Sequence, residues 1–273
     1  MQAVEADSRI SGRQGLAEAL LDVREVIKDF GGVRAVDCCS FAVRPQTITG
    51  LIGPNGAGKT TLFNLISGFH RPDAGKILFQ GEDVTGLPPH RIFHKGICRT
   101  FQIPREFKEM TVLENLMLVP TGQRGERLLN PWFRPGAVRR QETEIRDKAL
   151  GVLEYIKLIA LKDEYAKNLS GGQKKLLELA RTMMADPQLV LLDEPGAGVN
   201  PTLMKQLTQY IERICDELGI TFLLIEHDMD LVMTLCNPVV VMSEGKVLME
   251  GAPEEVRRDE RVLEAYLGGQ YRQ

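Results

Sequence analysis

The sequence lacks several features that would place it in a specialised class of protein. No stretch of its 273 residues approaches the run of about 20 apolar residues that a membrane-spanning helix needs. The net charge of −3 provides no overall basic field, so we expect no nucleic-acid partner. The first residues lack the basic and apolar blocks of a signal peptide. We therefore expect a globular protein that stays inside the cell and reaches any membrane through a partner.

Cysteines are few and scattered. The five are Cys38, Cys39, Cys98, Cys215 and Cys236, and they form no C-x-x-C pair and no metal-ligand spacing. An odd number without pattern is typical of reduced thiols in the cytosol.

Glycine, in contrast, is concentrated at one informative place. Residues 53–61 read Gly-Pro-Asn-Gly-Ala-Gly-Lys-Thr-Thr and fit the phosphate-binding pattern G-x-x-x-x-G-K-[ST]. An apolar run precedes the stretch, and apolar residues at helical spacing follow it, so the loop joins a strand to a helix. A glycine-rich turn with a surface lysine is the alternative, but the surrounding elements favour phosphate binding.

Each residue type in this loop has a physical reason to be there. Glycines at 53, 56 and 58 let successive N–H groups face one anion, and the helix start adds its positive dipole end. Lys59 can reach the outer phosphates, and the Thr60 hydroxyl can bind Mg²⁺. The predicted nucleotide residues of the loop are Gly53, Pro54, Asn55, Gly56, Ala57, Gly58, Lys59, Thr60 and Thr61.

A second candidate lies at the end of an apolar strand. Residues 189–194 read Leu-Val-Leu-Leu-Asp-Glu, which is typical of a buried parallel strand that carries polar groups at its carboxyl end. Asp193 would bind Mg²⁺ through water, and Glu194 would polarise the water that attacks a γ-phosphate. Alone, the segment could equally be a strand that ends in a polar turn; the phosphate loop upstream favours catalysis.

Residues 169–173 read Leu-Ser-Gly-Gly-Gln before an apolar-periodic helix. Ser170 and Gln173 fit a helix-capping box. However, Gly171 and Gly172 are costly in a first helical turn, and they permit an anion to approach bare N–H groups. The sequence by itself leaves both readings open.

Two polar residues end other predicted strands. His227 follows the strand 221–226, and Gln102 ends a strand over 96–102. Each could be an ordinary structural or solvated side chain, and neither would be informative without the other motifs.

The elements around these motifs alternate between strand and helix. We predict antiparallel strands within 21–43, a strand at 76–81, and a helix that starts near 87–90. After Ser170 we predict a helix to about 185, strands at 189–193 and 220–226, helices at 201–218 and 228–235, and a hairpin of 239–242 with 246–249. The last 20 residues predict one charged amphipathic helix. Such alternation indicates an α/β fold with a mostly parallel sheet.

The middle of the chain is different in character. Residues 112–119 and 142–159 have helical patterns, and the stretch 120–136 between them is rich in Pro, Gly and Arg. It contains Trp132, the only tryptophan, and would contact a partner or membrane headgroups, or else pack its own aromatic residues as an Ω-loop.

Together, these motifs resemble those of the ATP-binding-cassette (ABC) ATPases, from about Val23 to Gly268. In that resemblance, 53–60 is the Walker A loop, 189–193 is Walker B, Glu194 is the catalytic glutamate and LSGGQ is the signature. Gln102 corresponds to the Q-loop glutamine, and with Thr60 and Asp193 it forms the implied metal set. His227 corresponds to the switch histidine, and Phe30 corresponds to the aromatic residue that stacks on adenine.

The resemblance implies a P-loop NTPase (RecA-like) fold with an antiparallel β subdomain and an inserted α-helical subdomain. The implied domains are a lead-in over 1–20, an ATPase core over 21–102 and 170–249, a helical subdomain over 103–169 that contacts a permease, and a C-terminal helix over 250–273. It further implies that two cassettes hold ATP and Mg²⁺ between the Walker A loop of one and the signature of the other.

Within this family the chain is most similar to the ATPases of branched-chain and related hydrophobic amino-acid importers. Residues 96–102, 109–116, 192–201 and 265–268 carry this similarity. It implies a heterodimer with a second cassette, permease subunits, an external substrate-binding protein indirectly, and a peripheral place on the cytoplasmic face of the membrane.

One residue departs from the family pattern, and several other functions compete. Asn200 stands where most cassettes have Asp in the D-loop; asparagine keeps the hydrogen-bonding shape and loses the charge. A lipid or lipopolysaccharide exporter ATPase is the first alternative. A non-transport cassette would need a coiled-coil insertion or a second cassette, and a GTPase would need Asn-Lys-x-Asp; the sequence has neither. A scaffold would not need Lys59, Asp193, Glu194 and His227 together.

Overall fold

The computed structural model describes residues 19–100, 106–123 and 135–270, with the backbone alone for the last four of these. The described chain forms two compact units. The first unit comprises the residues up to Arg99, Gln188–Glu194 and the residues from Ile211 onward; the second comprises Thr100–Pro187 and Pro195–Tyr210. Among the described helices, none combines the length and apolar character that a membrane span requires.

Two sheets form the framework of the first unit. The four-stranded sheet has the order β2-β1-β4-β5 and is antiparallel throughout. Its strands are β1 (Leu21–Phe30), β2 (Val33–Val43), β4 (Ala74–Phe79) and β5 (Glu82–Asp83). This agrees with the antiparallel β subdomain that the sequence predicts.

The six-stranded sheet has the order β10-β9-β3-β8-β7-β6. All its pairs are parallel except β10 with β9, which form the predicted hairpin. The strands are β3 (Ile48–Ile52), β6 (Ile97–Arg99), β7 (Leu189–Asp193), β8 (Thr221–Ile225), β9 (Val239–Ser243) and β10 (Lys246–Gly251). Strands β3, β7 and β8 are buried at every position, which explains why they read as continuous apolar runs.

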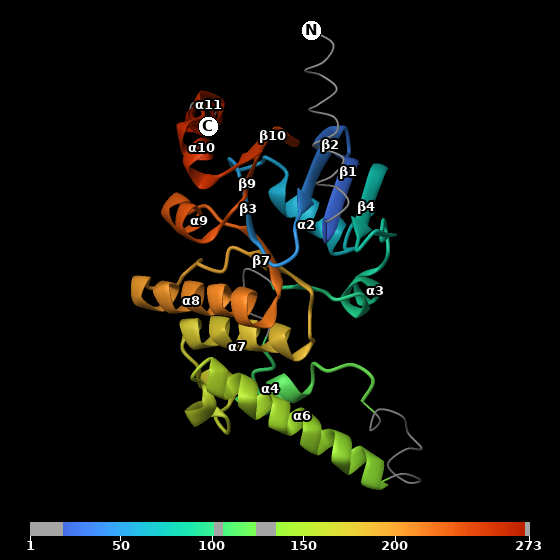
Figure 1. Ribbon diagram of the computed structural model, residues 1–273, viewed down its shortest axis with the longest axis vertical. Helices are drawn as coiled ribbons and strands as arrows, with labels where there is room; N and C mark the ends of the chain where they lie inside the picture. Colours follow the sequence, from blue (N-terminus) through green and yellow to red (C-terminus); the bar gives the residue numbers. More distant parts are fainter. Residues whose placement is uncertain (1–18, 101–105, 124–134, 271–273) are drawn as a thin grey trace. The chain divides into compact units, whose positions relative to one another are not determined.

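Short helices connect the strands or follow the last of them. In the first unit they are α2 (Lys59–Ile66), α3 (Pro89–His94), α9 (Met229–Leu235), α10 (Pro253–Arg258) and α11 (Glu260–Gln270) (Figure 1). The core beneath them is apolar and includes Phe63 and Phe79, both almost fully buried. Parallel strands joined through helices bring the carboxyl ends of β3, β7 and β8 to one edge of the sheet.

The second unit is helical. It contains α4 (Val112–Met117), α6 (Pro135–Tyr155), α7 (Gly171–Met184) and the 3-10 turns Ile159–Leu161 and Ala166–Asn168. Helices α4, α6 and α7 pack against one another (Figure 1). The division between the units falls within α8 (Pro201–Leu218), after Tyr210. The sequence analysis places the second segment of the ATPase core from Ser170 onward. In this division α7 belongs to the helical unit, and the chain re-enters the first unit at Gln188.

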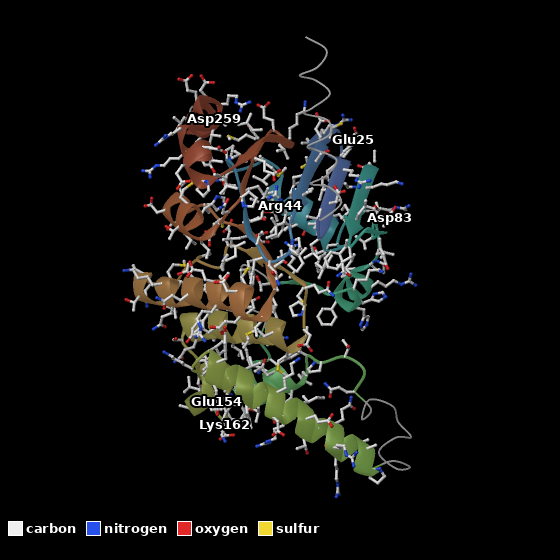
Figure 2. All side chains as sticks on the ribbon, viewed as in Figure 1. Glu25, Arg44, Asp83, Glu154, Lys162 and Asp259 are labelled. Atoms are coloured by element: carbon white, nitrogen blue, oxygen red, sulfur yellow. The ribbon has the colours of Figure 1, made fainter. Side chains whose placement is uncertain are left out.

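Two helix predictions were wrong in their bounds. The helix predicted over 142–159 spans Pro135–Tyr155, because Pro135 can occupy its first turn and Lys157 adopts a φ of 58° that ends the helical path. The single predicted C-terminal helix is two helices. Asp259, which is labelled in Figure 2, lies between them, has extended backbone and accepts a hydrogen bond from the Arg261 N–H.

Candidate functional site

The phosphate-binding loop joins the buried strand β3 to α2, as the sequence predicts. Gly58 precedes α2 with a φ of 97°, and a Cβ there would lie 2.3 Å from the Ala35 carbonyl oxygen. A Cβ on Gly53 would lie 2.1 Å from the Met242 carbonyl oxygen. Neighbouring backbone therefore requires glycine at both positions, and the loop is held closely from outside.

Exposure differs along the loop. Asn55, Gly56 and Thr60 are exposed, whereas Ala57 is buried and receives a backbone hydrogen bond at its carbonyl from the Gly245 N–H. Pro54 and Thr61 are half-buried. The tip of the loop and the first turn of α2 thus face solvent, where a polyphosphate could approach.

Lys59 lies folded into its own loop. Its side chain is buried, and Nζ donates hydrogen bonds to the carbonyl oxygens of Gly53 at 2.7 Å and Pro54 at 3.0 Å. Burial lowers the pKa of Lys59, and the negative charges of Glu194 and Asp193 act in the opposite direction. An ammonium group held among carbonyls near two carboxylates is positioned to exchange these partners for phosphate oxygens.

Asp193 forms a buried ion pair that the sequence analysis missed. Arg99 Nη2, at the end of β6, donates to Asp193 Oδ2 at 2.8 Å, and the two side chains are 8% and 11% exposed. Arg99 Nη1 also donates to Asn64 Oδ1 at 2.6 Å and to Ser67 Oγ at 3.1 Å, both on or next to α2. An arginine within an otherwise apolar strand was the available signal.

Glu194 and His227 contact each other. Glu194 Oε1 lies 2.6 Å from His227 Nε2, although the residues are far apart in sequence. Glu194 has a φ of 47°, which is uncommon for a non-glycine residue, and its N–H is fixed by the Ile225 carbonyl at 3.0 Å. Strained backbone that surrounding structure imposes is a frequent feature of catalytic positions.

Phe30, the predicted adenine contact, presents an accessible ring. It is 41% exposed at the end of β1. Its ring packs edge-on against His70 at 5.3 Å, and Lys28 Nζ lies 5.2 Å from the ring centre. These neighbours fix the orientation of an aromatic surface that a planar base could stack on.

In the second unit, both readings of the LSGGQ segment have support. Ser170 Oγ accepts the Gln173 N–H at 3.3 Å, and Gln173 Oε1 accepts the Ser170 N–H at 2.9 Å, so the capping box is present. Gly171 has open space around its missing Cβ, whereas a Cβ on Gly172 would lie 1.4 Å from Leu203 Cδ2. An alanine at 172 would therefore displace the Leu203 side chain, whereas the space at Gly171 is open to an approaching ligand.

Asn200 has a structural role that does not require the charge of an aspartate. Its Oδ1 accepts the Leu203 N–H at 2.9 Å, which caps the start of α8. Asparagine and aspartate serve almost equally well as helix caps, so the departure from the family pattern keeps this function.

Two predicted residues, Gln102 and Trp132, lie outside the described residues, and the predicted metal site depends on the nucleotide. Across the part of the chain that the structure describes, no group of three or more His, Cys, Asp or Glu side chains could hold a metal by itself. A Mg²⁺ site built from Thr60, Asp193 and nucleotide phosphates fits this donor set, since Mg²⁺ is commonly held by one or two carboxylates together with phosphates.

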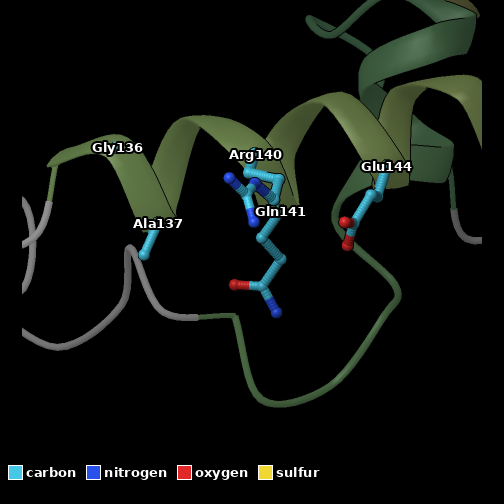
Figure 3. Close-up of a pocket in the computed structure, with 5 residues that line it drawn as sticks. All are labelled: Gly136, Ala137, Arg140, Gln141 and Glu144. Carbon is cyan, nitrogen blue, oxygen red and sulfur yellow. The ribbon is translucent and has the colours of Figure 1, made fainter.

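The second unit contains a pocket that is separate from the predicted nucleotide residues. It is formed by Gly136, Ala137, Arg140, Gln141 and Glu144 along one side of α6 (Figure 3). One of these residues, Gln141, donates from Nε2 to the Gly122 carbonyl oxygen at 3.3 Å. None of the predicted nucleotide residues lines this pocket, so it is not the nucleotide site.

Comparisons with known proteins agree with this geometry. A family model described as ABC transporter matches residues 36–197, and one described as branched-chain amino acid ATP-binding cassette transporter matches 246–272. A relative from Archaeoglobus fulgidus, described as the probable branched-chain amino acid transport ATP-binding protein LivG, is 45% identical and covers 92% of this chain and 96% of its own. The Pseudomonas aeruginosa high-affinity branched-chain amino acid transport ATP-binding protein BraF is 41% identical, with 93% and 99% covered.

A solved structure is similar throughout. It is the ADP conformation of an ATP-binding cassette of an ABC transporter, 38% identical, with a TM-score of 0.78 over 92% of this chain and 99% of that one.

Proposed function

The chain belongs to the ABC transporter family, as an ATP-binding subunit that hydrolyses ATP, and we propose that it drives the import of branched-chain or related hydrophobic amino acids. The contact between Glu194 and His227 at the end of the phosphate-loop sheet carries the catalytic part of this proposal. The names of the relatives and the family match at residues 246–272 support the solute class.

The proposed chemistry assigns one step to each side chain. The phosphate loop and Lys59 bind the β- and γ-phosphates, and Phe30 stacks on adenine. Glu194 accepts a proton from the attacking water, while His227 orients that water and contacts the γ-phosphate. Asp193, Thr60 and Gln102 would hold Mg²⁺, which would supply positive charge to neutralise the phosphates.

The proposed coupling uses a second cassette. Ser170, Gly171, Gly172 and Gln173 of each chain bind the γ-phosphate held by the phosphate loop of the other, because a helix start suits an anion. ATP then closes the pair and ADP releases it, since only ATP has the bridging group. The helical segment 103–169 docks a permease at the cytoplasmic face of the membrane, and the partner cassette is a similar but different chain.

Transport by the assembled complex tests this proposal. The chain is coexpressed with permease subunits and a second cassette of a branched-chain amino-acid importer, and the complex is placed in vesicles with a substrate-binding protein. We expect ATP-dependent uptake of labelled leucine.

Lys59→Ala provides the site control, because the loop then lacks its ammonium group; both ATP binding and uptake should be lost. ATP-driven movement of lipid without amino-acid uptake would favour the exporter instead, and unchanged ATP affinity in Lys59→Ala would refute the phosphate-loop assignment.

A further inference from the structure

The Asp193 carboxylate has a permanent cation beside it. Arg99 Nη2 lies 2.8 Å from Asp193 Oδ2, and both side chains are almost fully shielded from solvent. A guanidinium group stays protonated at any pH at which proteins fold, so this charge is always present. Asp193 is thus electrically neutralised before any metal arrives.

Arg99 is itself held in a fixed position. Its Nη1 donates to Asn64 Oδ1 and Ser67 Oγ, and the rings of Phe63 and Phe69 lie 5.7 and 5.8 Å from its guanidinium carbon. The guanidinium therefore connects β6, the α2 region that follows the phosphate loop, and the end of β7. A rigidly held arginine cannot move away when a second cation binds nearby.

From this geometry we infer that Arg99 is a positioning residue that acts as the resident counter-ion of Asp193 and limits how tightly Mg²⁺ is held in the nucleotide site. The inference rests on the proposed role of Asp193 toward Mg²⁺. Arg99 orients the carboxylate through its contact with Oδ2. Its positive charge opposes a divalent cation at the same carboxylate, so the metal can leave with the product.

The charge has two effects on binding, and both act on one measurable ratio. Without metal, Arg99 adds positive potential that favours a nucleotide polyphosphate. With metal, the same potential disfavours Mg²⁺. Removal of the charge should therefore raise the ratio of nucleotide affinity in Mg²⁺ to nucleotide affinity in EDTA.

The experiment measures this ratio with a fluorescent, non-hydrolysable ATP analogue bound to the full-length chain at equilibrium. For Arg99→Met we expect the ratio to rise at least about tenfold relative to the unsubstituted protein, from the loss of one charge near the metal. Arg99→Lys keeps the charge, so its ratio should stay within about threefold. Arg99→Gln, which retains hydrogen-bonding groups, replaces Arg99→Met if thermal unfolding shows that the latter is not folded.

A matched control exists in the other sheet of the same unit. Arg24 Nη2 lies 2.6 Å from the buried Asp22 carboxylate, so Arg24→Met also removes the arginine from an Arg–Asp pair. Its ratio should not change. An unchanged or lowered ratio in the neutral Arg99 variants, with normal nucleotide binding in EDTA, would overturn this inference and leave the proposed function intact. Failure of the unsubstituted protein to bind the analogue would instead contradict the proposed function.

Discussion

At the scale of single residues, the site depends on side chains whose backbone is held in unusual conformations. Glu194 has a φ of 47° directly after the buried strand β7, and its side chain contacts His227, which lies two residues after the neighbouring strand β8. A general base must be within hydrogen-bond reach of the water that it activates. The fixed backbone holds the Glu194 carboxylate beside His227, and the role of catalytic base stays a prediction.

Glu194→Gln tests this assignment. The amide keeps the size of the side chain and cannot accept a proton, so we expect ATP hydrolysis to slow by about 10²–10⁴ while ATP binding remains. Glu244→Gln is a suitable control, because Glu244 also has a positive φ, of 49°, but lies in the β9–β10 turn. Hydrolysis is followed by phosphate release; a normal rate in Glu194→Gln would remove Glu194 from its role.

Sequence reasoning proposed Lys59, Asp193, Glu194 and His227 because each lies at a short motif or at a strand end that the resemblance singles out. It missed Arg99, whose partner Asp193 is 94 positions away along the chain. Only the parallel pairing of β6 with β7 brings the two together, and no local pattern encodes that pairing. Residues that act through tertiary contacts are therefore the ones that motifs do not reveal.

At the scale of elements, the start of α7 combines stability with a proposed ligand site. The capping box between Ser170 and Gln173 satisfies two groups of the helix end, while the N–H groups of the first turn have no intrahelical acceptors. A helix can thus be well capped and still offer donors to an anion. The two readings of LSGGQ are compatible, which the sequence could not establish.

Gly171→Ala and Gly172→Ala form a matched pair that separates these two roles. At 172 the new Cβ would overlap Leu203, so we expect a loss of roughly 1 kcal/mol in the free energy of unfolding, after the gain in helix propensity. At 171 the space is open, and alanine should leave stability unchanged or raise it by about 0.5–1 kcal/mol.

Gly171→Ala, which should not lower stability, is expected to lower ATPase activity. If the γ-phosphate of another cassette approaches Gly171, the added methyl group displaces it, and ATPase activity of the assembled transporter should fall at least about tenfold. Chemical denaturation and ATPase assays on both variants give the comparison. Full activity in Gly171→Ala would mean that this glycine faces no ligand.

Elements differ in how well the sequence predicted them. The bounds of β7 and α8 agree with prediction, because a continuous apolar run and a long amphipathic period are strong signals. The C-terminal helices were predicted as one, since the break at Asp259 is a local backbone choice inside a pattern that stays amphipathic. Helix α6 begins earlier than predicted: its first two residues are Pro135 and Gly136, which are poor helix formers in a helix interior and are typical of loops.

At the scale of the whole molecule, the chain divides into one unit with the phosphate loop, Asp193, Glu194 and His227, and another with the LSGGQ helix. In the proposed mechanism, the two halves of a complete ATP site come from different chains. This arrangement would explain why ATP controls assembly: each unit holds one part of the site, and the γ-phosphate connects them.

Photocleavage of the vanadate-trapped transporter measures this central claim most directly. Vanadate with ADP occupies the γ-phosphate position, and ultraviolet light then cuts the backbone of the residues that touch it. We predict cuts in this chain within 53–60 and also at Ser170, identified by mass spectrometry of the fragments. Cuts within 53–60 with none in 169–173 would contradict the shared ATP site.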